Sequence, residues 1–157
     1  MQISFENKSV LITGGSRGIG LATALGFARA GARVAICARD QGGLDAAVVQ
    51  IAQSGNKVHG AICDVGDEGS ITGFVADAAA VLGGIDILVN NASGMSDGED
   101  ESAWLKGINV DLLGTVRTTR SAVPLLAGSG SGAIVNISSI RGMTGSKRLP
   151  ALSLIHI

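Results

Sequence analysis

A glycine-rich segment near the start of the chain has the composition of a phosphate-binding turn. Residues 13–20 read Thr-Gly-Gly-Ser-Arg-Gly-Ile-Gly and follow the apolar run of residues 9–12. In a turn between a strand and a helix, the first glycine permits the tight bend, the second lets backbone N–H groups approach a phosphate, and the third lets the helix pack on the strand. The segment therefore predicts a dinucleotide site made of Thr13, Gly14, Ser16, Arg17, Gly18, Ile19 and Gly20.

The same segment also fits the G-x-S-x-G pattern of a hydrolase nucleophile elbow, with Ser16 as the nucleophile. Such a hydrolase needs an oxyanion-forming segment before the serine, and an acid and a histidine late in the chain. Only 13 residues precede Gly14, and the two histidines are His59 and His156. We therefore interpret the segment as a phosphate turn.

Two arginines indicate which dinucleotide the site prefers. Arg39 follows the predicted strand Arg33–Ala38, where folds of this kind contact the adenosine ribose. An acid at that point hydrogen bonds the ribose 2′-OH, whereas an arginine favours a 2′-phosphate. The neighbouring Asp40 makes the signal mixed, but Arg17 adds a second cation inside the turn. Together the arginines favour NADP over NAD; the alternative is that both are solvated surface side chains.

The rest of the chain alternates between strand-like and helix-like segments. Apolar runs predict strands at 10–12, 34–37, 58–63, 85–89 and 133–137. Apolar residues spaced three and four apart predict helices around 21–28, 44–51 and 71–82. A longer stripe from Trp104 to Val123 predicts a fourth main helix, which Pro124 should kink or end. We interpret every stripe as core packing.

This alternation predicts an α/β fold, a Rossmann-type doubly wound parallel sheet of about five strands. Strands that are apolar throughout suit a sheet covered on both faces. The net charge of −1 gives no basic field for nucleic acid, and no apolar run approaches the ~20 residues of a membrane span. Cys37 and Cys63 are far apart in the sequence, so we expect buried thiols of a cytoplasmic protein rather than a disulfide or a metal site.

Four motifs in this order resemble the short-chain dehydrogenase/reductase family. They are residues 13–20, Asp64-Val65, Asn90-Asn91-Ala92 and the segment 134–139. The resemblance extends from about Lys8 to about Ala151. It implies reversible hydride transfer between the nicotinamide C4 of NADP(H) and a small-molecule carbonyl or alcohol, in a homo-oligomer without nucleic-acid or membrane partners.

The resemblance also implies a role for each motif. Asp64 and Val65 would flank the adenine ring, and the 90–92 segment would line the cofactor cleft and brace the central strand. Ser139 would polarise the substrate carbonyl. In this family a tyrosine then acts as general acid or base, and a lysine one helical turn further lowers the pKa of the tyrosine and holds the nicotinamide ribose.

Two departures from the family pattern precede the catalytic segment, and the first of them is mild. The family's Asn-Asn-Ala-Gly ends in Ser93 here, with Gly94 one place late. The helix asparagine of the family aligns with Asp111. The spacing to Gly114 and Pro124 supports this alignment and not one with the nearby Asn109. Asp111 is therefore a second candidate catalytic residue, whose carboxylate either holds the proton-relay water or weakens it.

A third departure removes the proton donor, because the chain contains no tyrosine. The family spacing from Ser139 puts the tyrosine at position 152 and the lysine at position 156, where Leu152 and His156 stand. Leucine has no proton to give, and the family pattern is lost beyond Ala151. We expect an inactive, truncated family member, with residues 1–151 as the NAD(P)-binding domain and residues 152–157 as a non-family tail.

Two other functions remain open. The chain could be a non-catalytic cofactor-binding module, such as a pseudoenzyme, a sensor or a subunit of a mixed oligomer. It could also be a methyltransferase that uses S-adenosylmethionine, although Ser138-Ser139 and Arg39 count against that fold. Turnover of NADPH separates an enzyme from a module, and binding of S-adenosylmethionine tests the methyltransferase.

Overall fold

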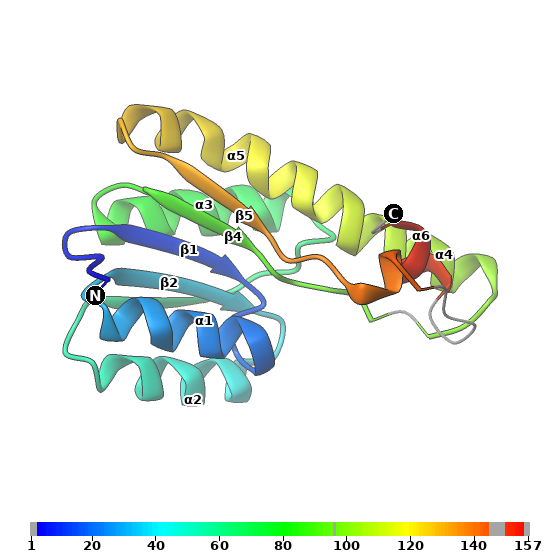
Figure 1. The fold of residues 1–157 in the computed structure, drawn as a ribbon, viewed down its shortest axis with the longest axis horizontal. Coiled ribbons are helices and arrows are strands. Elements are labelled where there is room, and N and C mark those ends of the chain that lie inside the picture. Colours follow the sequence, from blue (N-terminus) through cyan, green and yellow to red (C-terminus); the bar gives the residue numbers. More distant parts are fainter. Residues whose placement is uncertain (1–2, 96, 145–149, 156–157) are drawn as a thin grey trace.

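A parallel β-sheet forms the centre of the molecule in the computed structural model, which describes residues 3–95, 97–144 and 150–155 (Figure 1). Within these residues the sheet has five strands in the order β3-β2-β1-β4-β5. The strands are β1 (Ser9–Thr13), β2 (Arg33–Ala38), β3 (Val58–Ile62), β4 (Ile87–Asn90) and β5 (Ala133–Asn136). The chain moves outward from β1 to β3 and then crosses to the other side of β1 as β4, so the direction of winding reverses between β1 and β4.

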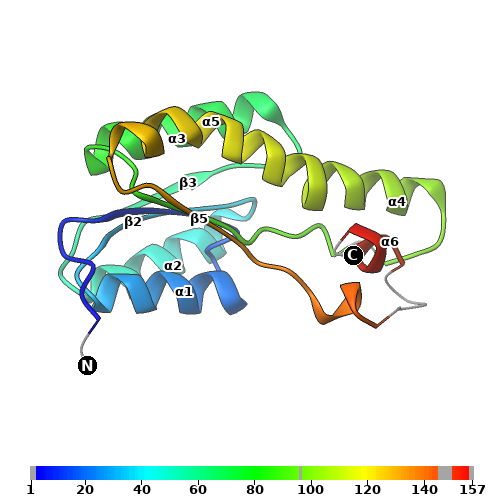
Figure 2. The same cartoon turned by 45° about the horizontal axis from the view of Figure 1, so that its top comes forward.

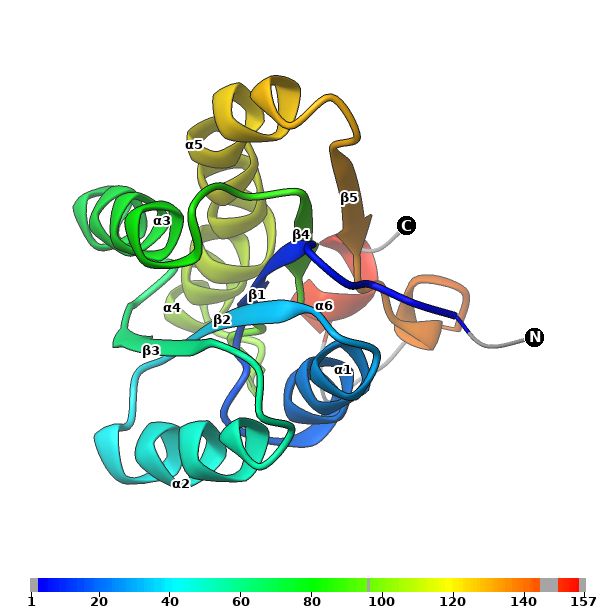
Figure 3. The same cartoon turned by 90° about the vertical axis from the view of Figure 1, so that its left-hand side faces the viewer.

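Helices pack on both faces of this sheet. Figure 3 shows α1 (Gly18–Arg29) and α2 (Gln41–Ala52) on one side, and α3 (Glu68–Leu82) and α5 (Gly114–Gly128) on the other. Beyond the carboxyl ends of the strands lie α4 (Glu101–Gly107), η2 (Ile140–Gly142) and α6 (Pro150–Ile155), as Figure 2 shows. The doubly wound α/β fold predicted from the alternation of strands and helices is confirmed.

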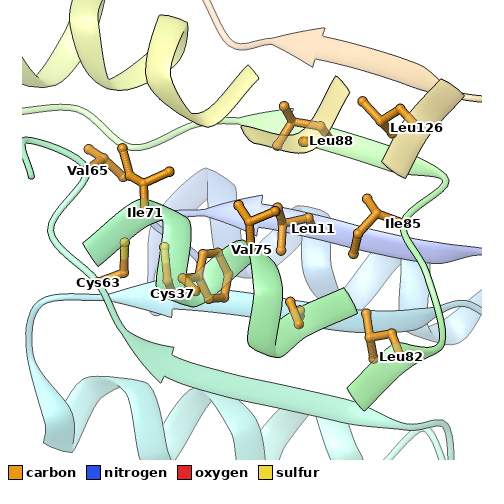
Figure 4. Packing of buried hydrophobic residues seen from close by; sticks show 14 of the residues in the cluster. Leu11, Cys37, Cys63, Val65, Ile71, Val75, Leu82, Ile85, Leu88 and Leu126 are labelled. Atoms are coloured by element: carbon orange, nitrogen blue, oxygen red, sulfur yellow. The ribbon is translucent and has the colours of Figure 1, made fainter. Parts of the chain in front are cut away.

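Two apolar layers hold the helices on the sheet, one on each face. Leu11 points toward α3, where it joins Val75 and Leu88 in the layer that Figure 4 shows. Its neighbours Val10 and Ile12 point the other way, toward α1 and α2. The alternation follows from the strand period of two. Burial of each large apolar side chain contributes about 1.5–3 kcal/mol, so the central strand stabilises both layers at once.

Burial decreases from the centre of the sheet toward its edges. β1, β2 and β4 are buried almost throughout, whereas β3 is half-buried and all residues of β5 are exposed. An edge strand has a neighbour on one side only, and in the part of the chain described here little covers β5. The expectation of a sheet covered on both faces therefore holds only for the three central strands.

The long stripe from Trp104 to Val123 was expected to be core, and this prediction is wrong. The segment forms α4, η1 (Ile108–Leu113) and α5, and its residues Leu112, Val116 and Val123 are exposed. The buried face carries Gly107, Val110, Asp111, Gly114, Thr118, Ala122 and Leu126. Most of these are small, because the helix approaches its neighbours closely: a Cβ on Gly114 would lie 2.9 Å from the carbonyl oxygen of Val65.

Pro124 was expected to kink or end the last long helix, and it does not end it. α5 continues to Gly128 with Pro124 inside it. Proline removes the amide hydrogen that would bond to the carbonyl of Arg120. Both residues lie on the exposed side of α5, where water can take the place of the missing donor.

Candidate active site

A cleft of about 940 Å³ lies at the carboxyl ends of β1 and β4, where the direction of winding reverses. Open α/β sheets bind ligands at this position, because the strands diverge there and the loops leave on opposite faces. All predicted site residues except Thr13 line the cleft: Gly14, Ser16, Arg17, Gly18, Ile19, Gly20, Arg39, Asp64, Val65, Asn90, Asn91, Ala92, Asp111 and Ser139.

The glycines of the first turn have the geometry that a phosphate site requires. Gly14 and Gly18 have φ angles of 67° and 56°, which side chains with a Cβ rarely adopt. A Cβ on Gly20 would collide with the carbonyl oxygen of Gly14, so only glycine lets α1 pack against the turn. A Cβ on Gly18 would meet nothing within 4 Å, because open space lies beside it. The turn therefore leaves room for a ligand against its backbone.

The amino end of α1 lacks the side-chain cap that α2, α3 and α4 carry. Asp40, Asp67 and Asp100 each accept a hydrogen bond from a backbone N–H in the first turn of α2, α3 and α4, at 2.6, 2.6 and 3.2 Å. The corresponding residue of α1 is Arg17, whose side chain makes no such bond. The first N–H groups of α1 thus remain available to an anion in the cleft.

Thr13 and Asn91 join this turn to the loop after β4. The hydroxyl oxygen of Thr13 accepts hydrogen bonds from the backbone N–H groups of Asn91 and Ala92, at 3.0 and 3.1 Å. The Asn91 amide donates in return to the carbonyl oxygens of Thr13 and Gly14, at 2.9 and 3.1 Å. Thr13 is buried and lies behind the cleft wall. It supports the turn from behind rather than lining the cleft.

Asn90 connects β4 to the elements on its far side. Its Nδ2 donates to Oδ1 of Asn136 at 2.8 Å and to Oγ1 of Thr119 at 3.1 Å. The two asparagines are opposite one another in the β4–β5 register. Asn90 Oδ1 is buried in the wall and has no hydrogen-bond partner in the part of the chain described here.

Arg39 and Asp40 are engaged differently at the end of β2. Both line the cleft. The Asp40 carboxylate accepts the N–H of Gly43 at 2.6 Å and so serves as the cap of α2. The Arg39 side chain is exposed and makes none of the ion pairs or hydrogen bonds found among the described residues. At the end of β2 the acid thus serves as a helix cap, while the guanidinium has no partner among the described residues.

The loop after β3 forms another wall of the cleft. The Asp64 carboxylate accepts the N–H of Gly66 at 2.9 Å, and the hydroxyl oxygen of Ser70 accepts the N–H of Asp64 at 3.1 Å. The next residue, Val65, packs into the core below α3. These bonds hold the loop against the start of α3 and fix the position of Asp64 and Val65 in the wall.

Asp111 lies in a widened helical turn that faces the cleft. η1 is a π-helical segment, in which the Gly114 N–H bonds to the carbonyl of Asn109, and such turns are frequent at functional sites. The buried Asp111 carboxylate accepts the N–H of Gly94 at 2.7 Å. Gly94 follows the 90–92 segment, so the carboxylate anchors the loop in which the chain departs from the family pattern.

Ser139 and Leu152 lie in the remaining wall. The Ser139 hydroxyl oxygen accepts the N–H of Arg141 at 3.2 Å, which leaves its own hydrogen free to donate into the cleft. Leu152 of α6 also lines the cleft and is 7% exposed. Ala151 and Ser153 beside it are buried as well, and α6 crosses the predicted domain boundary after residue 151. His156 lies outside the described residues.

The cleft contains residues that sequence reasoning missed. Asn136 could have been found, since it stands in a strand predicted to neighbour the one that ends at Asn90. Met95 has a φ of 44°, a strained backbone conformation that no local pattern predicts. Some of the other missed residues adjoin predicted ones in the sequence or lie within a predicted motif, namely Ala38, Cys63, Ser93, Val110, Leu112 and Ile137. Others come to the cleft from elsewhere in the fold: Cys37, Gly43, Thr115, Val116 and Ile155.

The described residues contain neither a metal-binding cluster nor a membrane-spanning helix. No three His, Cys, Asp or Glu side chains gather there in a way that could hold a metal ion. Among the helices of the same residues, none is both long and apolar enough to cross a membrane.

Comparison with known proteins identifies the family. The family model described as short chain dehydrogenase matches residues 8–153. The chain belongs to the short-chain dehydrogenase family. It is 36% identical over 152 residues to the (2S)-[(R)-hydroxy(phenyl)methyl]succinyl-CoA dehydrogenase subunit BbsD of Thauera aromatica, covering 94% of this chain and 61% of that one.

Solved structures of this family have the same fold. L-sorbose reductase from Gluconobacter frateurii, complexed with NADPH and L-sorbose, superposes with a TM-score of 0.94 and 30% identity over 99% of this chain and 61% of that chain. An NAD⁺-bound xylitol dehydrogenase superposes with a TM-score of 0.92 and 25% identity over 97% and 60%. The chain thus spans about three fifths of each of these short-chain dehydrogenases.

Proposed function

We propose that this short-chain dehydrogenase chain binds NADP(H) in the cleft, with the pyrophosphate on the 13–20 turn and the adenosine toward Arg39. Bound NADP(H) supplies a hydride donor or acceptor at its nicotinamide C4. The open space beside Gly18 and the uncapped start of α1 fit a pyrophosphate. Asp64 and Val65, which line the cleft, would flank the adenine, and Asn90, Asn91 and Ala92 would line the cofactor cleft and brace the central strand.

The preference for NADP rests on one observation, the contrast between Arg39 and Asp40. The acid that would bind a ribose 2′-OH already caps α2, while the guanidinium at the end of β2 is open to the cleft. A 2′-phosphate gives that guanidinium a partner, and Arg17 adds a second positive charge to the same cleft. Relatives in the family occur with either NADPH or NAD⁺, so the preference has to come from these side chains.

Titration of the chain with NADPH and NADH tests this preference. A paired guanidinium–phosphate contact contributes about 1.5–3 kcal/mol, so Arg39→Ala should weaken NADPH binding roughly tenfold to a hundredfold and leave NADH binding unchanged. Arg29→Ala, which removes an exposed arginine at the far end of α1, serves as the matched control. Equal affinity for the two dinucleotides, unaffected by Arg39→Ala, would refute the preference.

We further propose that the chain binds its cofactor without turning over a substrate. In the complete site of the family, Ser139 would polarise a carbonyl while a tyrosine moves the proton. Here the tyrosine's place is taken by Leu152, which lines the same cleft as Ser139 and has no titratable group. General acid catalysis by a positioned side chain contributes ~10²–10⁴-fold, and Asp111 does not replace it, since its carboxylate is engaged by Gly94.

Absorbance of NADPH at saturating carbonyl substrate tests this second part. We expect no oxidation above the uncatalysed rate with a panel of ketones, aldehydes and quinones, while NADPH binding persists. Steady turnover by the unmodified chain, lost in Ser139→Ala, would show that an active site is complete without the tyrosine.

These two results also separate the alternatives. Binding of NADPH without turnover supports a non-catalytic cofactor-binding module, whereas binding of S-adenosylmethionine in place of NADPH would support a methyltransferase. For a complete enzyme, we also propose a small-molecule carbonyl or alcohol as the substrate and assembly into a homo-oligomer, both suggested by family membership. The absence of a nucleic-acid partner is proposed from the net charge of −1, and a cytoplasmic location from the two unpaired thiols.

A further inference from the structure

The two cysteines of the chain lie side by side in the wall of the cleft. Cys37 is in β2 opposite Ala61 of β3, and Cys63 follows β3 two residues further along on the same face. Their side chains are 1% and 2% exposed, belong to the apolar layer below α3 and border the cleft. Figure 4 shows the two sulfur atoms next to each other and pointing the same way. Burial of both thiols was expected, but their proximity was not.

Each thiol changes the acidity of the other. A hydrogen bond from the Cys37 thiol, helped by one from Ser70, lowers the pKa of Cys63 in spite of burial and the charges of Asp64 and Asp67. The same contact with Cys63, together with burial, raises the pKa of Cys37. Cys63 is therefore the more acidic thiol of the pair and Cys37 the less acidic one, which is the order expected of an attacking and a resolving cysteine.

The pair also touches two different parts of the candidate nucleotide site. The Cys37 sulfur accepts a hydrogen bond from the backbone N–H of Gly14, the first glycine of the phosphate turn. Cys63 directly precedes Asp64 and Val65 in the loop after β3. A chemical change at the sulfurs is therefore transmitted to the turn on one side and to that loop on the other.

We propose that Cys37 and Cys63 form a redox-active dithiol, which hydrogen peroxide converts to a disulfide, and that this disulfide opposes binding of the dinucleotide. The Cys63 thiolate attacks the peroxide, so that an S–O bond forms, the O–O bond breaks and one water leaves after protonation. The Cys37 sulfur then attacks the resulting sulfenic acid; an S–S bond forms, the S–O bond breaks, and the departing hydroxide takes the Cys37 proton as a second water. Both sulfurs are oxidised, and the peroxide is reduced to water.

The strand register explains why the disulfide would disturb the cleft. Parallel neighbours lie ~4.8 Å apart and rise ~3.3 Å per residue, so residues offset by two positions are about 8 Å apart at Cα. A relaxed disulfide holds its Cα atoms at about 5.5–6 Å. Closing the bond must pull the end of β3 toward β2, and Asp64 and Val65 move with it. The resulting strain also makes the bond easy to reduce, so the change is reversible.

Peroxide treatment of the reduced chain tests the dithiol directly. Because Cys37 and Cys63 are the only cysteines, any intramolecular disulfide must join them, and intact-mass measurement should show loss of the two thiol hydrogens. In Cys37→Ser the resolving thiol is gone, and Cys63 should accumulate as a sulfenic acid that dimedone traps. Failure of the unmodified chain to form an intramolecular disulfide, or trapping by dimedone at Cys37 instead of Cys63, would overturn the assignment.

The effect on binding is measured with the same samples. NADPH affinity should fall about tenfold or more on oxidation and return with dithiothreitol, while in Cys63→Ala, which lacks the attacking thiol, peroxide should leave that variant's own NADPH affinity unchanged. The proposed effect of the disulfide on binding rests on the proposed cofactor. It would be refuted by an oxidised form that binds NADPH as tightly as the reduced form. If the reduced chain itself does not bind NADPH, the cofactor proposal and the proposed regulation of binding fail together. The mass measurement then tests on its own whether the two cysteines form a disulfide.

Discussion

At the scale of single residues, Asp111 shows how a departure from a family pattern can keep its structural role. Its carboxylate oxygen accepts the Gly94 N–H at 2.7 Å inside the protein. An amide oxygen is also a hydrogen-bond acceptor, so the asparagine of the family could make the same contact. The acid therefore stabilises the loop after β4 without needing its charge.

Asp111→Asn should consequently change the free energy of unfolding little, whereas Asp111→Ala should lower it by about 1–3 kcal/mol, because the buried N–H of Gly94 loses its partner. Urea unfolding followed by circular dichroism measures both. If the asparagine variant is destabilised as much as the alanine variant, then the charge itself is what the site requires.

At the scale of elements, one arginine links the π-helical segment to the loop after β3. Arg117 of α5 donates through Nη1 to Asn109 Oδ1 at 2.7 Å and to the carbonyl oxygen of Gly66 at 3.2 Å. Asn109 Nδ2 donates to the same carbonyl at 3.1 Å. The network holds the loop with Asp64 and Val65 against the helix that carries Asp111, so two walls of the cleft share one support.

Arg117→Met should lower the free energy of unfolding by about 1.5–3 kcal/mol, since hydrogen bonds from a charged group are lost while the aliphatic stem remains. Arg120→Met is the matched control, because Arg120 is exposed on the same helix and its replacement should stay within ~0.5 kcal/mol. Urea unfolding of both variants decides; equal losses would mean that the network contributes nothing specific.

Local sequence signals predicted the elements well, and tertiary contacts explain where they failed. The glycine turn was predictable because Gly14 and Gly18 adopt positive φ angles, and glycine is the residue type that does so readily. The exposed face of α4 and α5 was not, since an apolar stripe looks the same whether it meets the core or solvent. Trp104, Ile108, Leu112 and Val116 are spaced four residues apart, which is wider than the 3.6 residues of an α-helical turn. This wider spacing indicates the π-helical segment.

The site residues also divide into those that local motifs predict and those that only tertiary contacts bring together. Arg39 and Leu152 could be placed from spacing within a motif, and both line the cleft. The Cys37–Cys63 contact and the Arg117 network join segments that only the sheet order and helix packing bring together. Pair contacts of this kind leave no periodicity in a single sequence.

At the scale of the whole molecule, the open side of β5 is the weak point. β5 pairs with β4 and is the edge of the sheet among the described residues. Ile134 and Val135, on opposite faces of the strand, are 41% and 45% exposed. Beside Ile134 an apolar hollow is lined by Val123, Leu126, Ala127, Gly130 and Gly132. Unpaired backbone groups next to exposed apolar side chains are a template for pairing with another chain.

We therefore predict that the isolated chain self-associates through β5, in a concentration-dependent way. Val135→Lys should reduce this association, because a charge on an edge strand opposes strand addition, and it should leave the unfolding midpoint of the monomer nearly unchanged, since the side chain is exposed. Size-exclusion chromatography with light scattering measures the association. Val49→Lys, at an exposed apolar position of α2 away from the edge, is the matched control. The prediction fails if the chain stays monomeric at high concentration, or if Val135→Lys and Val49→Lys reduce its association equally. Either result would show that the chain does not self-associate through β5.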